Sequence, residues 1–256
     1  MTRLNGAAIL VTRPAHQAEA LCQLIEAAGG KALRFPTLAI VAVPDVAQVQ
    51  NVLANLSQYQ WLIFISANAV NFALNANGGK IAQFHPLRIA AIGQATAKAI
   101  TASGLHVSCV PKAGFDSAAL LASPEFQEVA GVHFLIVRGE GGREELADVL
   151  RARGADVAYL DVYKRQMPAC DASGLEGLLA RQQLAAITIT SGEALQTLLL
   201  MIAPQYHPYL MVIPIVVVSD RLRQMASSLG FEQIAVAAQP ADAAVFEAVT
   251  TCLTGK

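Results

Sequence analysis

The chain has 256 residues, of which 54% are hydrophobic and 14% charged, and its formal net charge at pH 7 is −1. This composition excludes a disordered chain, and the length allows one or two domains with a substantial core. A nearly neutral chain without a basic run lacks the concentrated positive face that nucleic-acid binding generally needs, so we expect no nucleic-acid partner.

The hydrophobic runs are too short for membrane insertion. None reaches the roughly 18 residues of a membrane helix. The longest, residues 209–219, is interrupted by Pro214 and is interpreted as a buried strand. The run before Thr12 and Arg13 is too short for a signal peptide, so we expect a cytoplasmic protein without a membrane partner.

The cysteines show no metal-binding pattern. There is no CxxC pair, and no histidine stands at metal-ligand spacing from any cysteine. We therefore expect four free, mostly buried thiols and no metal (Cys22, Cys109, Cys170 and Cys252).

In chain order, the first predicted strand is the hydrophobic run 7–13. Over residues 15–30, hydrophobic side chains recur at the spacing of one helix face (Leu21, Leu24, Ile25 and Ala28). A second strand is predicted over residues 31–43, and strand–helix segments follow at 61–74 and 88–107.

The second half repeats this plan. The strand, helix and strand predicted at 133–139, 142–154 and 156–165 correspond to the first three elements, at an offset of 125 residues. Three further pairs of segments follow in the same order at offsets of 125 or 126: 61–74 with 185–199, 88–107 with 214–234, and 112–123 with 238–249. This internal duplication predicts an α/β protein with parallel sheets covered by helices on both faces.

Small, hydroxylic, glycine and arginine residues follow the predicted strands, where helices begin. Ligands of parallel sheets bind at such positions, and helix N-termini favour anions. Serine, threonine and aspartate at these positions are also ordinary helix caps. The prediction of an anion site therefore depends on the pattern recurring in both halves of the chain. The positions are 12–14, 66–68, 93–96, 138–143, 190–192 and 219–221, including Arg13, Arg138, Arg143 and Arg221.

The glycine-rich turn "RGEGGREELADVLRARG" at residues 138–154 does not fit a dinucleotide site well. A GxGxxG fingerprint from Gly139 would require glycine where Glu144 stands, although Asp161 lies at a suitable distance. P-loop, nucleophile-elbow and HExxH motifs are absent. The pattern suits a polycarboxylate ligand. The alternatives are a non-catalytic two-domain cleft-binding protein for a small polyanionic ligand and a dinucleotide-dependent oxidoreductase.

Several motifs together resemble one family. They are "ILVTRP", "FISANAV", "AIGQATAKAI", "LIVRGEGGRE", "VYKR", "ITITSGEALQ" and "VVVSDRL", in this order over nearly the whole chain. With them the chain resembles the uroporphyrinogen-III synthase family, most closely its gammaproteobacterial members.

The resemblance implies two similar flavodoxin- or Rossmann-like α/β domains joined by a two-stranded linker, with the substrate in the cleft between them. Domain one is then expected at 1–35 and 167–256, and domain two at 45–156. The linker strands are expected at 36–44 and 157–166. A monomer is expected, because one chain would enclose the ligand.

The implied activity is that of a cyclising hydro-lyase in tetrapyrrole (haem, sirohaem) biosynthesis, without a cofactor. The substrate, hydroxymethylbilane, is a linear tetrapyrrole with eight carboxylates. Its ring A hydroxyl leaves, ring D attacks through its substituted carbon, and a spiro intermediate rearranges to uroporphyrinogen III with ring D inverted.

The resemblance also implies residue roles. Tyr163 matches the family's functional tyrosine and is expected to donate a hydrogen bond to the departing hydroxyl; the alternative is a tyrosine that packs its ring. Substrate carboxylates are expected to bind Arg13, Ser66, Thr96, Arg138, Gly141, Gly142, Arg143, Ser191, Ser219 and Arg221. Leu222 departs from the pattern set by Thr96, so Ser219 or Arg221 is expected to substitute.

Four residues keep a structural alternative. Arg138 is alternatively an ion-pair residue that bridges strand and helix, and Gly139 is alternatively needed for backbone geometry. For Lys164 and Arg165 solvation is favoured over anion binding.

Overall fold

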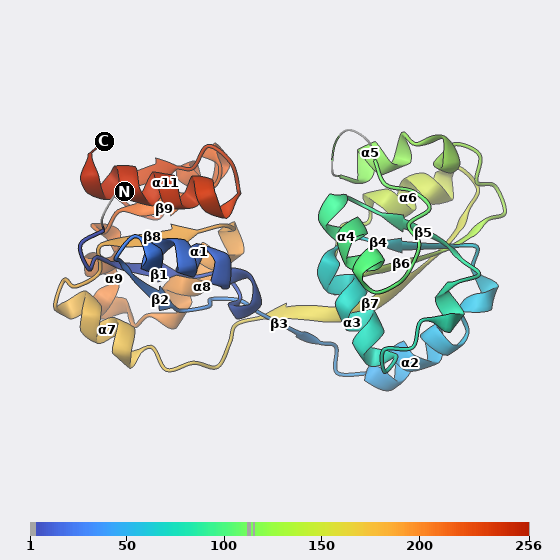
Figure 1. Cartoon of the computed structure of the whole chain (residues 1–256), viewed down its shortest axis with the longest axis horizontal. Helices are drawn as coiled ribbons and strands as arrows, with labels where there is room; N and C mark the ends of the chain where they lie inside the picture. The colour runs from blue at the N-terminus through green and yellow to red at the C-terminus, as the bar shows by residue number, and fades with distance from the viewer. Residues whose placement is uncertain (1–3, 112–113, 115, 256) are drawn as a thin grey trace. The chain divides into compact units, whose positions relative to one another are not determined.

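The computed structural model describes residues 4–111, 114 and 116–255. The chain forms two compact units, and most of their helices and strands are labelled in Figure 1. Unit 1 comprises Met1–Ala39 and Gln166–Lys256, and unit 2 comprises Ile40–Arg165. Residues 112, 113 and 115 of the aligned segment 112–123 lie outside the described residues, as do residues 1–3 and 256 of the predicted domain one.

The sheet of unit 2 has the strand order β3-β7-β6-β4-β5, and β4, β5, β6 and β7 run parallel. Its strands are β3 (Ala39–Ala42), β4 (Trp61–Phe64), β5 (Arg88–Ala91), β6 (His133–Gly139) and β7 (Asp156–Gln166). Its helices are α2 (Val46–Ala54), α3 (Ala67–Ala76), α4 (Gln94–Ala102), α5 (Ser117–Leu121) and α6 (Glu145–Ala152).

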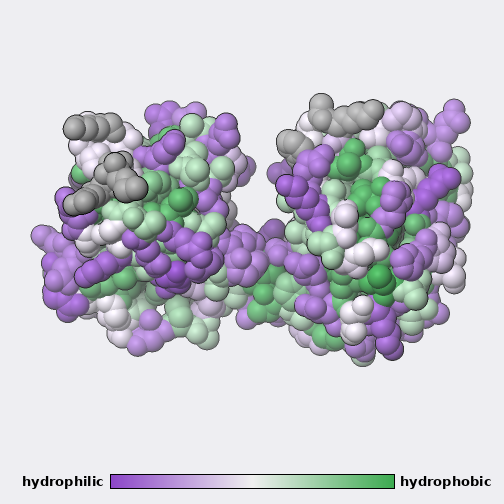
Figure 2. All heavy atoms as spheres, in the orientation of Figure 1, coloured by the Kyte–Doolittle hydropathy of each residue, from purple (hydrophilic) through white to green (hydrophobic). Residues whose placement is uncertain are grey.

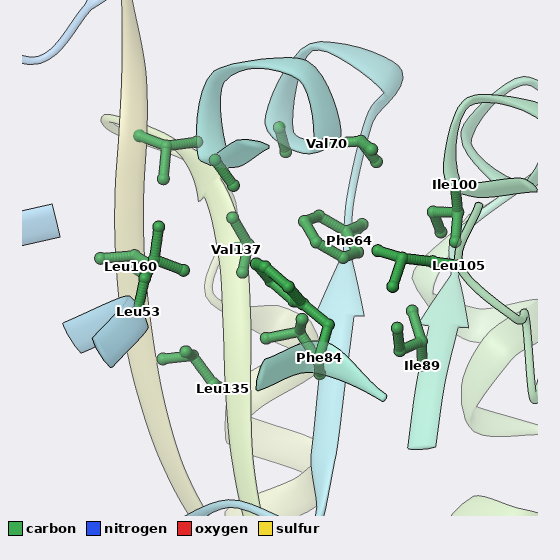
Figure 3. Close-up of a cluster of buried hydrophobic side chains, with 14 of the residues drawn as sticks. Leu53, Phe64, Val70, Phe84, Ile89, Ile100, Leu105, Leu135, Val137 and Leu160 are labelled. Atoms are coloured by element: carbon green, nitrogen blue, oxygen red, sulfur yellow. The ribbon is translucent and has the colours of Figure 1, made fainter. Parts of the chain in front are cut away.

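The side chains of β4 alternate between the two faces of this sheet, because successive strand residues point in opposite directions. Phe64 belongs to one buried cluster with Leu53 of α2 and Val70 of α3, which Figure 3 shows. Ile63 belongs to the cluster on the other face, with Leu120 of α5 and residues of α6. Helices therefore cover both faces, as is typical of parallel sheets.

The sheet of unit 1 has the order β10-β9-β8-β1-β2, with all neighbouring strands parallel. Its strands are β1 (Ala8–Val11), β2 (Lys31–Arg34), β8 (Ala186–Ile189), β9 (Ile215–Val217) and β10 (Ile234–Val236). Its helices are α1 (Ala15–Ala27), α7 (Ser173–Ala180), α8 (Gly192–Met201), α9 (His207–Met211), α10 (Asp220–Ser228) and α11 (Asp242–Thr254).

The core of unit 1 is divided in the same way. Ile9 and Val11 of β1 share a buried cluster with residues of α1 and α11. Leu10, between them in sequence, shares a second cluster with residues of α7, α8 and α10. Both faces of this sheet are therefore also covered by helices.

The two sheets confirm the predicted fold class and carry the internal repeat. Unit 1 has the order β9-β8-β1-β2, and the strands at the matching offset in unit 2 have the order β5-β4-β6-β7. Even β10 has a counterpart, because Cys109 forms an isolated parallel bridge with Ala90 at the outer edge of β5.

The strand predicted over residues 31–43 is two strands. β2 ends at Arg34, β3 begins at Ala39, and the two belong to different sheets. Pro36 lies between them, and a proline has no backbone N–H with which to continue a ladder. The repeat-equivalent segment has no proline and forms the continuous strand β7.

The buried strand predicted over residues 209–219 is also corrected. Its first part belongs to α9, which ends at Met211, and only Ile215–Val217 forms the strand β9. Hydrophobicity alone does not distinguish a short buried helix from a strand, and Pro214 separates the two elements here.

Two of the four thiols are buried, rather than most of them. All four cysteines are free; Cys22 and Cys109 are buried, whereas Cys170 and Cys252 are exposed. Burial raises the pKa of the Cys22 and Cys109 thiols.

No helix in the described part of the chain is long and hydrophobic enough to cross a bilayer. On the face shown in Figure 2, hydrophilic residues are interspersed with hydrophobic ones over each unit. Such mixing is normal for a folded protein, because isolated hydrophobic residues are common at protein surfaces.

Candidate active site

The strand ends of unit 2 form one edge that carries a pocket. Parallel strands bring their carboxyl ends to the same edge of the sheet. The pocket there has a volume of about 570 Å³, within the range of small-molecule sites. Its lining comes from the ends of β4 to β7 and the starts of α5 and α6: Ile65, Ile92, Asp116, Ser117, Ala118, Ile136, Arg138, Gly139, Gly141, Gly142, Arg143, Glu145, Leu146, Tyr163 and Arg165.

The glycine-rich turn between β6 and α6 forms one wall of this pocket. Gly141 has a φ of 72°, a left-handed conformation that favours glycine. A Cβ on Gly142 would lie 3.2 Å from Cδ of Arg138, so this glycine leaves room for the arginine side chain. Both glycines stand beside the start of α6, where backbone N–H groups lack helical partners.

Arg138 uses its guanidinium to tie this turn to β7. Its Nε donates to Oδ1 of Asp161 at 2.9 Å, and its Nη1 donates to the carbonyl oxygen of Gly142 at 3.2 Å. Its Cζ lies 3.6 Å from the centre of the Tyr159 ring. The side chain is thus fixed on three sides, and its ion-pair partner lies on the neighbouring strand instead of on a helix.

Arg143 and Arg165 are the exposed cations of the pocket. Both line it, and among the described residues no ion pair or side-chain hydrogen bond is formed by either. Asp116 and Glu145 also line the pocket, but Asp116 accepts a hydrogen bond from the Ala119 N–H at 2.9 Å as the cap of α5. The sequence interpretation favoured solvation for Arg165, and the structure places it in the lining.

Tyr163 faces the start of α3. Its hydroxyl lies 3.2 Å from Oγ of Ser66, which in turn accepts a hydrogen bond from the Ala69 N–H at 3.1 Å. The ring centre lies 5.7 Å from that of Phe72, and the residue is only 2% exposed. A buried phenol with a fixed hydroxyl at the wall of a pocket can donate a hydrogen bond in a defined direction.

The remaining predicted residue of unit 2 is buried outside the lining of the pocket. Thr96 lies in the first turn of α4 and is 3% exposed. The lining described above includes Ile92, at the end of β5, but neither Thr96 nor Ser66.

The predicted residues of unit 1 also gather at the carboxyl ends of its parallel strands. Ser191 caps α8 by accepting from the Ala194 N–H at 3.1 Å, and Ser219 caps α10 by accepting from the Leu222 N–H at 3.3 Å. Arg221 is exposed on α10.

Arg13 forms an ion pair with Asp242 at the start of α11. Its side chain is largely buried. The guanidinium is therefore engaged within unit 1 itself.

Sequence reasoning did not assign a site role to Asp116, Ser117 or Ala118. The signal available was the repeat, because Asp116 aligns with Asp242. Among the described residues, no group of three or more His, Cys, Asp and Glu side chains could hold a metal ion.

Comparison with known proteins gives the family. Residues 19–247 match the family described as uroporphyrinogen-III synthase HemD. The uroporphyrinogen-III synthase of Salmonella typhimurium is 36% identical over 90% of this chain and 94% of its own length. That of Escherichia coli is 34% identical over the same shares of the two chains.

Solved structures show the same fold. A mutant uroporphyrinogen III synthase from Thermus thermophilus superimposes with a TM-score of 0.63 at 18% identity, covering 98% of this chain and 100% of that one. A uroporphyrinogen-III synthetase from Helicobacter pylori gives 0.61 at 15% identity, covering 94% and 97%. The resemblance inferred from the motifs is confirmed, and the chain belongs to the uroporphyrinogen-III synthase family.

Proposed function

We propose that this protein is a uroporphyrinogen-III synthase, which cyclises hydroxymethylbilane with loss of water and inversion of ring D. The family match over residues 19–247 supports this activity and does not favour the non-catalytic cleft binder. The observation that carries the proposal is Tyr163, whose hydroxyl is fixed beside Ser66 at the wall of a pocket that also contains Arg143 and Arg165.

The pocket of unit 2 suits carboxylate arms of the substrate. Arg143 and Arg165 supply positive charge, and Arg138 keeps N–H groups beyond the two used by Asp161 and Gly142. The backbone at the start of α6 adds the partial positive charge of a helix N-terminus. These groups bind one end of the tetrapyrrole and bring the ring A hydroxymethyl group to Tyr163.

Tyr163 then assists departure of the hydroxyl group. The bond between the methylene carbon and this oxygen breaks as the pyrrole nitrogen lone pair forms the new C=C and C=N bonds, and the Tyr163 O–H donates a hydrogen bond to the leaving oxygen. The pyrrole N–H proton passes to the departing hydroxide, which gives water and a neutral azafulvene. When the Tyr163 O–H turns to the leaving oxygen, Ser66 is the donor in its contact with the Tyr163 oxygen. Ser66 also accepts from the Ala69 N–H, which completes a chain of three donors. Such chains polarise each successive bond and strengthen the last one.

Positioning of ring D determines the isomer. Unassisted closure of the bilane gives the type I product, so the protein must present the substituted carbon of ring D to the azafulvene. Well-oriented groups can lower a barrier by roughly 7–11 kcal/mol. The remaining carboxylate arms are assigned to the other predicted substrate-binding residues, Arg13, Thr96, Ser191, Ser219 and Arg221. The proposal also includes a cytoplasmic monomer.

An isomer assay tests this function. Freshly generated hydroxymethylbilane is supplied to the protein, the products are oxidised, and type I and type III uroporphyrin are separated by chromatography. Predominant type III that depends on native protein is expected. Type I alone, at the rate measured without protein, would reject the assignment and favour the non-catalytic binder. Light scattering of the same sample measures the oligomeric state.

A further inference from the structure

An irregularity in the pairing of β6 with β7 lies directly at Tyr163. The two strands pair in continuous register from His133 with Asp156 to Arg138 with Asp161, but Gly139 then pairs with Tyr163. Val162 is thus an extra residue in β7. A bulge of this kind changes the face on which the following side chains lie.

The bulge transfers Tyr163 to the face covered by α3. Before it, Leu160 packs in the cluster of α2, α3 and α4, and Tyr159 packs against the cluster of α5 and α6. In an unbroken strand Tyr163 would lie on the same face as Tyr159. Instead it belongs to the same cluster as Leu160 and Val162, the side on which Ser66 begins α3.

Gly139 provides the space that this arrangement requires. A Cβ on Gly139 would lie 2.5 Å from both Cε2 and Cζ of the Tyr163 ring. Because non-bonded carbon atoms in van der Waals contact are ~3.5–4.0 Å apart, the ring would have to move by roughly 1 Å. The φ of Gly139 is not positive, so the close approach of the ring, and not backbone strain, is what requires glycine here.

We infer that Gly139 is a positioning residue for Tyr163, acting together with the bulge at Val162. The ring rests against the bare backbone of β6, the Phe72 ring packs near it, and the hydroxyl reaches Ser66. The inference rests on the role proposed above for Tyr163, and it assigns Gly139 a role distinct from those of Gly141 and Gly142 in the turn.

A Gly139→Ala variant tests the inference in the isomer assay. We expect kcat for type III formation to fall by about 100-fold, the order of loss that a 1 Å misplacement can cause, with KM little changed. Gly174→Ala is the matched control, because Gly174 has no positive φ and nothing within 4 Å of an added Cβ. Wild-type kinetics are expected for the control.

Combining Gly139→Ala with Tyr163→Phe identifies the route of the effect. If Gly139 acts through the Tyr163 hydroxyl, the double variant loses no more activity than Tyr163→Phe alone. Losses that multiply would show that Gly139 acts elsewhere and would overturn the inference.

A measurement without substrate separates this inference from the proposed function. With ¹³C-labelled tyrosine rings, the signal of Tyr163 among the five tyrosines is identified by its loss in Tyr163→Phe. We expect this signal to shift in Gly139→Ala and to stay in place in Gly174→Ala. An unmoved signal in folded Gly139→Ala contradicts the inference. A shifted signal in a protein that forms no type III product would reject only the function.

Discussion

The two units of this protein use equivalent arginines differently. Arg13 of unit 1 follows β1, Arg138 of unit 2 lies near the end of β6, and the two are separated by the repeat offset of 125 residues. Arg13 pairs with Asp242 at the start of α11. Arg138 instead pairs with Asp161 on β7, although Asp116, the counterpart of Asp242, lines the same pocket.

One position on the neighbouring strand differs between the two units. Pro36 stands in unit 1 where the repeat places Asp161 in unit 2, so unit 1 offers no carboxylate there. In unit 2 this carboxylate holds Arg138 against Tyr159 and Gly142. We infer from the comparison that the Asp161 carboxylate, which unit 1 lacks at the matching position, directs Arg138 towards β7.

The largest effect is expected at Tyr163, whose counterpart in unit 1 is Leu38. Tyr163→Phe keeps the ring and removes the hydroxyl that we propose as the donor to the leaving group. We expect kcat for type III formation to fall by about 100-fold, the lower end of what a positioned proton donor contributes. Leu38→Ala is the control and should keep kcat near wild type. Full turnover by Tyr163→Phe would remove the assigned role.

An intermediate effect is expected from Asp161→Ala, which makes unit 2 resemble unit 1. Arg138 loses its partner and is expected to pair with Asp116 across the pocket, so KM should rise about tenfold, or ~1.4 kcal/mol in binding. Asp156→Ala, which removes an exposed carboxylate from the same strand, is the control. An equal rise of KM in both variants would argue against a specific role for Asp161.

A smaller effect is expected for Arg165, whose counterpart in unit 1 is the uncharged Ile40. Arg165→Ala removes one exposed cation from the pocket, and we expect KM to rise by about fivefold, the order of loss for one partly solvated charged contact. The control is Arg181→Ala, an exposed arginine of unit 1. The difference between the two variants should shrink at high salt, and a salt-independent difference would contradict an electrostatic role.

The smallest effect is expected in the labelling rate of one buried thiol in each unit. Only thiolates react with iodoacetamide, and burial raises the pKa of Cys22 and Cys109. The labelling rate of both should therefore keep increasing with pH beyond the pKa of a free thiol. It should remain far below that of Cys170, whose pKa is also raised but whose thiol is exposed to the reagent. Mass spectrometry of the labelled cysteines in urea then reports the opening of each unit separately.

The sequence was sufficient for the fold because periodicity and the repeat are both written in the order of hydrophobic residues. Pro36 and Pro214 mark the two places where an expected strand was wrong, since a hydrophobic run does not show where backbone pairing stops. The site was harder to predict from the sequence than the fold. The bulge at Val162 changes the face of every later residue in β7, so Tyr163 and Arg165 cannot be placed without knowing it.

The structure of the Asp161→Ala variant tests the central comparison most directly. A crystal structure that resolves the Arg138 side chain shows which carboxylate forms an ion pair with it. We predict an ion pair between Arg138 and Asp116, as Arg13 forms with Asp242, and a correspondingly smaller pocket. An Arg138 side chain that stays stacked on Tyr159, beside an unchanged pocket, would show that Asp161 does not redirect it.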